Sequence, residues 1–173
     1  MKRLGLLRHA KSDWGPSDKR DFDRGLNERG RRGAALIGGH IRDHGVHWDR
    51  VIASPARRVK LTLESAVIDT TPAWDERLYL ASKDTIYDVL AEANGDAVLV
   101  AGHNPGLGDL ALDLVAPAQE SALFDEVRAK FPTAAFAVLE LDIDQWTDLR
   151  PECGVLVHFK RPRDLDPALG PEN

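Results

Sequence analysis

The sequence predicts an α/β protein, a three-layer α/β/α sandwich with a mainly parallel central sheet. Short apolar runs of strand length alternate with amphipathic segments of helix length, which is typical of this class. Three of the apolar runs end in polar residues, as buried parallel strands do where open α/β sheets bind ligands. The chain has 173 residues, 43% of them hydrophobic, which suits one domain with a substantial core.

The first half of the chain has two strands and two helices with clear boundaries. Asn27 is a typical N-cap, Gly45 is a typical helix stop, and Pro55 suits the first turn of a helix. Residues 11–25 are polar and rich in Asp, Gly and Ser, so they predict a long loop, and such loops are often functional. The expected elements are strands over 4–7 and 49–54 and helices over 28–44 and 56–68.

The second half continues the alternation, although residues 70–83 follow no clear period. Asn94-Gly95-Asp96 is a turn signal that precedes the third apolar run. After residue 160 the chain is rich in proline and poor in apolar residues, so we expect a single domain over 1–162 and a loosely ordered tail over 163–173. The expected elements are strands over 97–101, 136–143 and 154–159 and helices over 84–93, 107–115 and 118–130.

Composition excludes several functional classes. The formal net charge of -5 does not favour nucleic acid or an anionic membrane as a partner. The single cysteine, Cys153, allows no internal disulfide and no cysteine-rich metal pattern. The first apolar run is too short for a signal peptide and no segment reaches membrane-spanning length, so we expect a cytoplasmic protein. Nothing in the sequence indicates the oligomeric state.

Basic residues follow the ends of three predicted strands: Arg8 and His9, then Arg57 and Arg58 just beyond Ser54, then His103. The carboxyl ends of parallel strands share one edge of the sheet, so these side chains are expected to meet in one crevice. Nothing acidic stands at the same points, so the expected ligand is a small dianion, most simply a phosphoryl group. The alternative is three unrelated strand ends with ordinary surface residues. The shared polarity at a shared structural position favours the crevice.

The stretch Leu6-Leu7-Arg8-His9-Ala10-Lys11-Ser12-Asp13-Trp14 resembles the Arg-His-Gly signature of the histidine phosphatase superfamily, which includes the phosphoglycerate mutases. Ala10 in place of the usual glycine, followed by Lys-Ser-x-Trp, is most similar to the phosphohistidine phosphatase (SixA-type) branch. Three further stretches match that branch in order, over 23–30, 53–57 and 102–105. The resemblance covers residues 4 to about 107. It implies a phosphoglycerate mutase-like fold and an activity that needs no cofactor.

The resemblance also implies roles for individual residues. His9 would accept the phosphoryl group, and Arg8, Arg57 and His103 would form the phosphate pocket, with Arg58 at the surface. Arg24, Ser12 and Asn104 would contact the substrate, although Arg24 also suits a solvated loop position. A neutral imidazole can attack phosphorus while the arginines bind the phosphoryl oxygens, and nearby positive charge should lower the pKa of His9. Because arginines supply the charge, no metal ion is expected.

Two positions depart from the mutase-like members of the superfamily. Gly15 stands where they usually have asparagine, and Leu80 aligns with their acidic proton donor. An alkoxide leaving group needs a proton donor, whereas the need is weaker for an imidazole leaving group. The loss of the acid therefore favours a phosphoramidate substrate, such as phosphohistidine on a protein. Four acidic residues remain as donors in another geometry: Asp13, Asp75, Glu76 and Asp84.

The sequence thus predicts a phosphatase that acts through a phosphohistidine on His9, most simply on a phosphorylated protein. The alternatives are a small-molecule phosphomonoesterase, or a non-catalytic module that binds phosphate or a phosphoprotein. One further cluster has metal-ligand spacing, since His40, His44 and His47 lie at and after the end of a predicted helix. Histidines are also favourable at a helix carboxyl end without metal, and this simpler interpretation is preferred.

Overall fold

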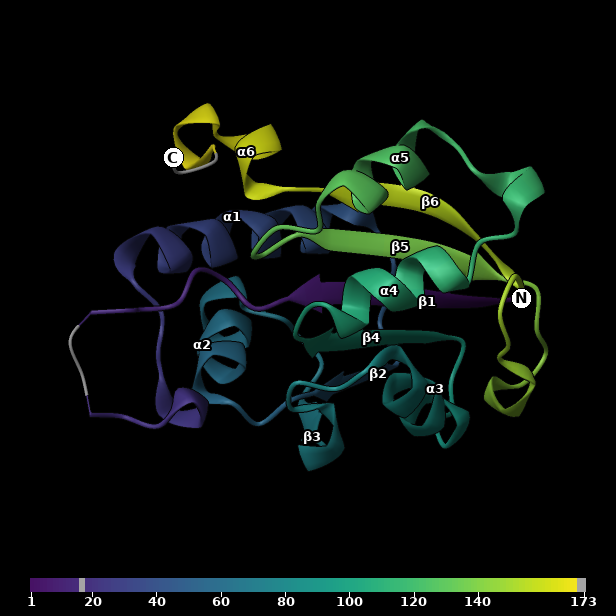
Figure 1. Ribbon diagram of the computed structural model, residues 1–173, viewed down its shortest axis with the longest axis horizontal. Coiled ribbons are helices and arrows are strands. Elements are labelled where there is room, and N and C mark those ends of the chain that lie inside the picture. Colours follow the sequence, from purple (N-terminus) through teal and green to yellow (C-terminus); the bar gives the residue numbers. More distant parts are fainter. Residues whose placement is uncertain (16–17, 171–173) are drawn as a thin grey trace.

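The computed structural model describes residues 1–15 and 18–170, which form a six-stranded sheet with helices on both faces (Figure 1). The sheet order is β3-β2-β4-β1-β5-β6. The strands β3, β2, β4 and β1 run parallel, whereas β5 is antiparallel to both β1 and β6. The predicted α/β class with a mainly parallel sheet is confirmed. The strand bounds are β1 Lys2–Arg8, β2 Arg50–Ala53, β3 Pro72–Trp74, β4 Ala97–Gly102, β5 Phe136–Leu141 and β6 Gly154–Lys160.

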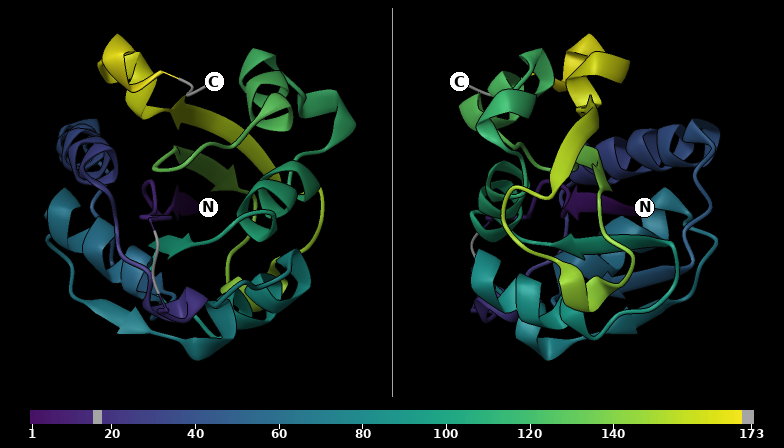
Figure 2. Two further views of the ribbon diagram at one scale, coloured as in Figure 1. Left: turned by 60° about the vertical axis from the view of Figure 1, so that its left-hand side comes forward. Right: turned by 90° about the vertical axis from the view of Figure 1, so that its right-hand side faces the viewer.

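The helices divide into two layers (Figure 2). Helices α1 (Glu28–His44) and α2 (Arg57–Ala66) cover one face of the sheet. The other face is covered by α3 (Lys83–Ala91), α4 (Gly106–Asp113) and α5 (Ala122–Ala129). Side chains alternate along a strand, so Leu4 and Leu6 of β1 pack into the α3–α5 core while Leu7 packs into the other. β1 is therefore buried on both faces, and its carboxyl end is held firmly.

The first helix fixes the loop that follows β1. The Asn27 side chain accepts a hydrogen bond from the Gly30 amide at 2.7 Å, which confirms the predicted N-cap. A side chain at Gly30 would lie 2.2 Å from the Lys11 carbonyl oxygen, so only glycine lets α1 approach the loop this closely. The helix ends at Gly45, whose φ of 91° is a left-handed conformation.

Two regions differ from the sequence-based expectation. β3 lies within the aperiodic stretch and extends the sheet by pairing with β2, although it is too short to show a period. Residues 163–170, expected to be loosely ordered, instead complete α6 (Pro162–Leu165) and form a 3₁₀ turn (Pro167–Leu169). Arg29 fixes this segment by donating to the carbonyl oxygens of Ala168 and Gly170, at 2.9 and 2.7 Å. Residues 171–173 of the expected tail lie outside the described residues.

Among the described residues, no helix combines the length and the apolar character that crossing a bilayer requires.

Candidate active site

His9 follows β1 directly and is only 8% exposed. Its amide donates to the Gly102 carbonyl oxygen at 3.0 Å, and its own carbonyl oxygen accepts from the Ala134 amide at 3.0 Å. The ring Nδ1 lies 2.7 Å from the Ala10 carbonyl oxygen, so Nδ1 carries the proton and Nε2 carries the lone pair. The ring is therefore fixed in the tautomer that a nucleophile needs.

The pKa of His9 is lowered to about 3, chiefly because the ring is buried. The positive charges of Arg8 and Arg58 and the neighbouring His103 lower it further, while the hydrogen bond to Ala10 opposes the shift. The lowered pKa of His9 was expected from nearby charge, but burial contributes more. At neutral pH the imidazole is uncharged and nucleophilic.

Arg8 reaches the same cavity as His9. Its Nη1 donates to the Phe131 carbonyl oxygen at 3.0 Å, and its buried Nε has no hydrogen-bond partner among the described residues. A buried donor without a partner is costly, so an anion that accepted from it would be bound favourably.

The two arginines of α2 lie in the reverse of their expected positions, one in the cavity and the other at the surface. Arg58, expected at the surface, is 4% exposed and lines the His9 cavity, whereas Arg57 is exposed and does not. The reason is helical periodicity: Arg58 shares the inward face with Thr62 and Ala66, four and eight residues later. Arg57 lies on the opposite side, near Gly25. The prediction that Arg58 is a surface residue is wrong, and the spacing to Thr62 and Ala66 was the signal that could have corrected it.

His103 lies at the end of β4 with its ring centroid 5.4 Å from that of His9. Arg58 Nη2 lies 3.4 Å from His103 Nδ1, and His103 Nε2 lies 2.8 Å from Ser54 Oγ. Because Arg58 can only donate, His103 Nδ1 accepts from it, so Nε2 is protonated and donates a hydrogen bond to Ser54 Oγ. Burial, followed by the charge of Arg58, lowers the pKa of His103 to about 4. The three strand ends thus meet in one place, as the parallel topology requires.

Asp21 is a carboxylate that the strand-end argument missed. It comes from the long loop after β1 and accepts hydrogen bonds from Arg58 Nη2 at 3.1 Å and the Tyr79 hydroxyl at 2.5 Å. These bonds, that of Tyr79 first, lower the pKa of the Asp21 carboxyl, so it is ionised at neutral pH. The carboxylate orients Arg58 and keeps the cavity from being purely cationic. A loop that folds back over the sheet edge leaves no periodic signal in the sequence.

Of the three residues predicted to contact the substrate, two line the His9 cavity and one does not. Ser12 and Asn104 line the His9 cavity, and the buried Ser12 hydroxyl has no hydrogen-bond partner in the part of the chain that the structure describes. The Asn104 amide is engaged with the Phe131 carbonyl oxygen at 2.7 Å. Arg24 lies outside the cavity lining, with its guanidinium 4.5 Å from the centre of the Trp14 ring. Leu80, aligned with the missing acid, lines the cavity and is 56% exposed, with a φ of 50°.

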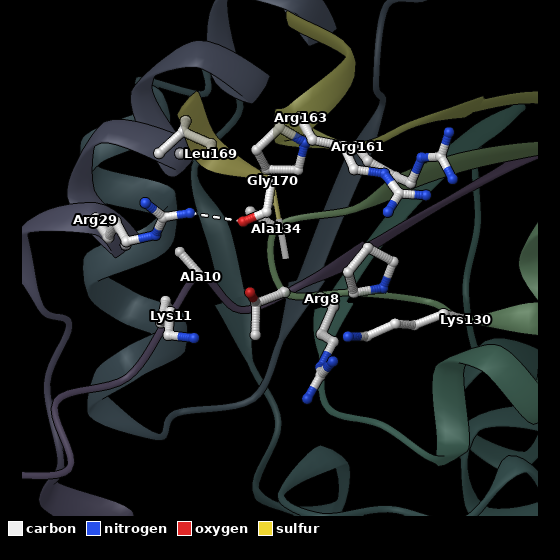
Figure 3. Close-up of a pocket in the computed structure, with 15 residues that line it drawn as sticks. Arg8, Ala10, Lys11, Arg29, Lys130, Ala134, Arg161, Arg163, Leu169 and Gly170 are labelled. Atoms are coloured by element: carbon white, nitrogen blue, oxygen red, sulfur yellow. Dashed lines mark hydrogen bonds between the residues drawn. The ribbon is translucent and has the colours of Figure 1, made fainter. Parts of the chain in front are cut away.

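Two cavities lie side by side. The His9 cavity has a volume of about 360 Å³. The second, of about 330 Å³, shares Arg8, Lys11 and Thr133 with it. We call this the basic cavity, because six cationic side chains line it and no acidic one does among the described residues: Arg8, Lys11, Arg29, Lys130, Arg161 and Arg163 (Figure 3). An anion in the His9 cavity would therefore sit beside a second region of positive charge.

Comparisons with known proteins identify a family and a similar sequence. A family model described as "Histidine phosphatase superfamily (branch 1)" matches residues 4–79. An uncharacterized protein of Mycobacterium tuberculosis (strain H37Rv) is 37% identical over 160 residues, which cover 91% of this chain and 100% of the relative.

Two solved structures extend the similarity to the whole fold. A protein from Nakamurella multipartitia assigned as phosphohistidine phosphatase SixA is 31% identical, with a TM-score of 0.82 over 93% of this chain and 96% of that one. Its counterpart from Agrobacterium tumefaciens is 27% identical, with a TM-score of 0.77 over 93% and 98%. The sequence match, the shared fold and a histidine with basic neighbours at the strand ends lead to one conclusion: the chain belongs to the histidine phosphatase superfamily.

Proposed function

We propose that this phosphatase removes phosphoryl groups from phosphohistidine on a protein, through a phosphohistidine intermediate on His9. The observation that carries the proposal is the lining of the His9 cavity. A neutral imidazole lies there beside Arg8 and Arg58. Among the described residues of that lining, Asp21 alone has a carboxyl group, and it is held ionised. The described lining of the cavity therefore offers charge stabilisation but no carboxylic acid as proton donor.

The mechanism follows from these positions. Arg8 and Arg58 would bind the phosphoryl oxygens, with His103 beside them, as negative charge spreads over the group. The lone pair on His9 Nε2 forms the new bond to phosphorus while the bond to the leaving nitrogen breaks. The leaving imidazole takes the electron pair on a ring that can already carry a proton, so it needs no external acid. Water then attacks the phosphohistidine, which releases phosphate and restores neutral His9.

The other acids named from the sequence give this interpretation further support. Asp75 is paired with Arg77 at 2.8 Å, and Asp84 lies 3.5 Å from Lys83. Neither of these, nor Asp13 or Glu76, lines the His9 cavity. Leu80, which the sequence aligns with the family's acid, does line it. The names of the two similar structures point to the same substrate class.

The basic cavity favours a second candidate, a small molecule with a phosphoryl group and another anionic group. Its six cations lie next to the His9 cavity, and Arg8 belongs to both. A phosphate or carboxylate tethered to the scissile group could occupy it, because charge-assisted hydrogen bonds to arginine are strong.

A panel of substrates tests these proposals together. Phosphate release is measured from a phosphohistidine protein, an aryl phosphate, an alkyl monophosphate and an alkyl bisphosphate. The phosphohistidine proposal expects the highest kcat/KM on the first substrate, whereas the second candidate expects it on the bisphosphate. Release from none of them, with phosphate binding retained, would indicate a binding module and overturn both.

Variants of the basic cavity add a second readout. Lys130→Ala and Arg163→Ala should raise KM for a substrate with a second anionic group more than for the aryl phosphate. The matched control is Arg128→Ala, which removes an exposed arginine of α5 that lines neither cavity. Equal KM values in all three variants would exclude the basic cavity from substrate binding.

A further inference from the structure

Three histidines gather outside the active site. His40 and His44 lie one turn apart on α1, and His158 lies on β6. One ring nitrogen from each lies within 4.8 Å of the other two, and the Nε2 atoms of His40 and His158 are 2.7 Å apart. The sequence grouped His47 with the first two, but His47 is exposed beyond the end of α1 and does not join the cluster.

The fold explains why these rings converge. Residues four apart on a helix project from the same face, so His40 and His44 both face the sheet. His158 pairs with Val138 of β5, next to the helix that covers this face. The Phe136 ring lies edge-on to all three imidazoles, with centroids 6.5, 6.1 and 5.9 Å away. The apolar surface around a metal site controls solvent access and the local dielectric, and Phe136 supplies such a surface here.

The three rings are also uncharged at neutral pH. Burial, followed by the proximity of His44 and His40, lowers the pKa of His158 to about 4. The pKa values of His40 and His44 are lowered as well, mainly by burial. The surrounding charges are Lys160 and Arg3, which lower these values, and Asp43, which raises that of His40. Metal ions bind the neutral form of histidine, so the ligands are in the required state.

We propose that His40, His44 and His158 bind one divalent transition-metal ion of the zinc type, with water completing the coordination. Zn–N bonds of about 2.0–2.1 Å at tetrahedral angles separate two ligand nitrogens by about 3.4 Å. That value lies between two distances in the cluster. The Nε2 atoms of His40 and His158 are 2.7 Å apart, and the ligand atoms of the three histidines all lie within 4.8 Å of one another. Imidazole ligands suit zinc, copper, nickel and cobalt rather than magnesium or calcium.

The site is separate from the phosphatase centre. The charge that acts on His44 comes from Arg3, near the start of β1, whereas His9 follows the end of the same strand. The ion would join α1 to the edge strand β6 and so stabilise the fold, and it takes no part in phosphoryl transfer.

Metal titration of the purified full chain tests the proposal. After treatment with a chelator and its removal, Zn²⁺ is added during calorimetry and Co²⁺ during measurement of visible absorption. Wild type and His47→Ala should bind one ion per chain, give the intense cobalt bands of four-coordinate geometry and gain thermal stability with Zn²⁺. Loss of a residue that only supports a metal ligand costs about 10–100-fold in metal affinity. His44→Ala and His158→Ala each remove a direct ligand, so each should lose at least that much affinity.

Two variants keep the test decisive. Circular dichroism and phosphatase activity show whether each variant folds, and His44→Ala removes a ligand from the last turn of α1 even if His158→Ala does not fold. Folded variants that bind Zn²⁺ as wild type does would overturn the proposal. Loss of binding in His47→Ala alone would overturn it too, because the ligands would then lie elsewhere.

Discussion

Replacement of each arginine in the Arg57-Arg58 pair distinguishes the two faces of α2. Arg58→Ala removes a side chain that is 4% exposed and reaches both Asp21 and His103. Arg57→Ala removes an exposed guanidinium outside the His9 cavity. The two variants differ by one position and delete the same charge, so each is the control for the other.

The expected losses differ by orders of magnitude. Loss of one preorganised donor to developing charge costs about 10²–10³ in kcat, or about 2.7–4 kcal/mol. Arg58→Ala should reach or exceed this range because its donor is charged. Breaking a fully buried ion pair destabilises a protein by about 3–5 kcal/mol. Arg58→Ala should lower the free energy of unfolding by less than this, since the Asp21 side chain is 42% exposed and water can solvate it. Arg57→Ala should change kcat only a few-fold.

The assay compares kcat and KM for an aryl phosphate and for a phosphohistidine protein, beside urea denaturation. Both substrates should be affected alike, because the phosphoryl group is common to them. Arg58→Lys should recover part of the loss, since the charge returns without the planar fork. The assignment fails if Arg57→Ala loses as much activity as Arg58→Ala, or if a folded Arg58→Ala variant retains activity near that of wild type.

Four further predictions concern the nucleophile, the missing acid, metal and pH. His9→Ala should abolish turnover with the fold intact, and a rapid quench without acid should trap phosphate on wild-type His9; phosphate on His103 would contradict the assignment. Leu80→Glu should raise kcat/KM for alkyl phosphates relative to phosphohistidine, and an unchanged ratio in a folded variant would mean that Leu80 does not replace the acid. Activity should survive EDTA in a chain that stays folded, because arginines supply the charge, and restoration by Mg²⁺ or Zn²⁺ of an activity that a folded chain had lost would refute this. Proton NMR should show His9 titrating near pH 3 instead of 6.5. Since the unfolded chain takes up protons that the folded ring does not, His9 should reduce stability as pH falls from about 6.5 toward 3, as denaturation midpoints can verify.

The sequence predicts well those features that depend on local pattern. β1, β4 and the Asn27 cap leave clear signals, and the parallel topology brings Arg8, His9 and His103 together without further information. Their catalytic roles stay predictions until the variants are measured.

The choice between Arg57 and Arg58 depends on the helical face, which the spacing of Arg58, Thr62 and Ala66 indicates in the sequence itself. Features that depend on tertiary contact have no such signal. Asp21 reaches the site through an aperiodic loop, and His158 joins the other two histidines only because β6 lies beside α1. Neither contact has a signature in the linear spacing of residues.

The antiparallel pairing of β1 with β5 has a consequence for protein synthesis. All the signature motifs have been translated by residue 105, yet Arg8 is held by the carbonyl oxygen of Phe131 and the His9 carbonyl oxygen accepts from Ala134. β1 keeps an open edge until β5, which ends at Leu141, can pair with it. A nascent chain therefore carries every residue of the signature before it can hold a finished site, and the site is completed only when residues 131–141 leave the ribosome.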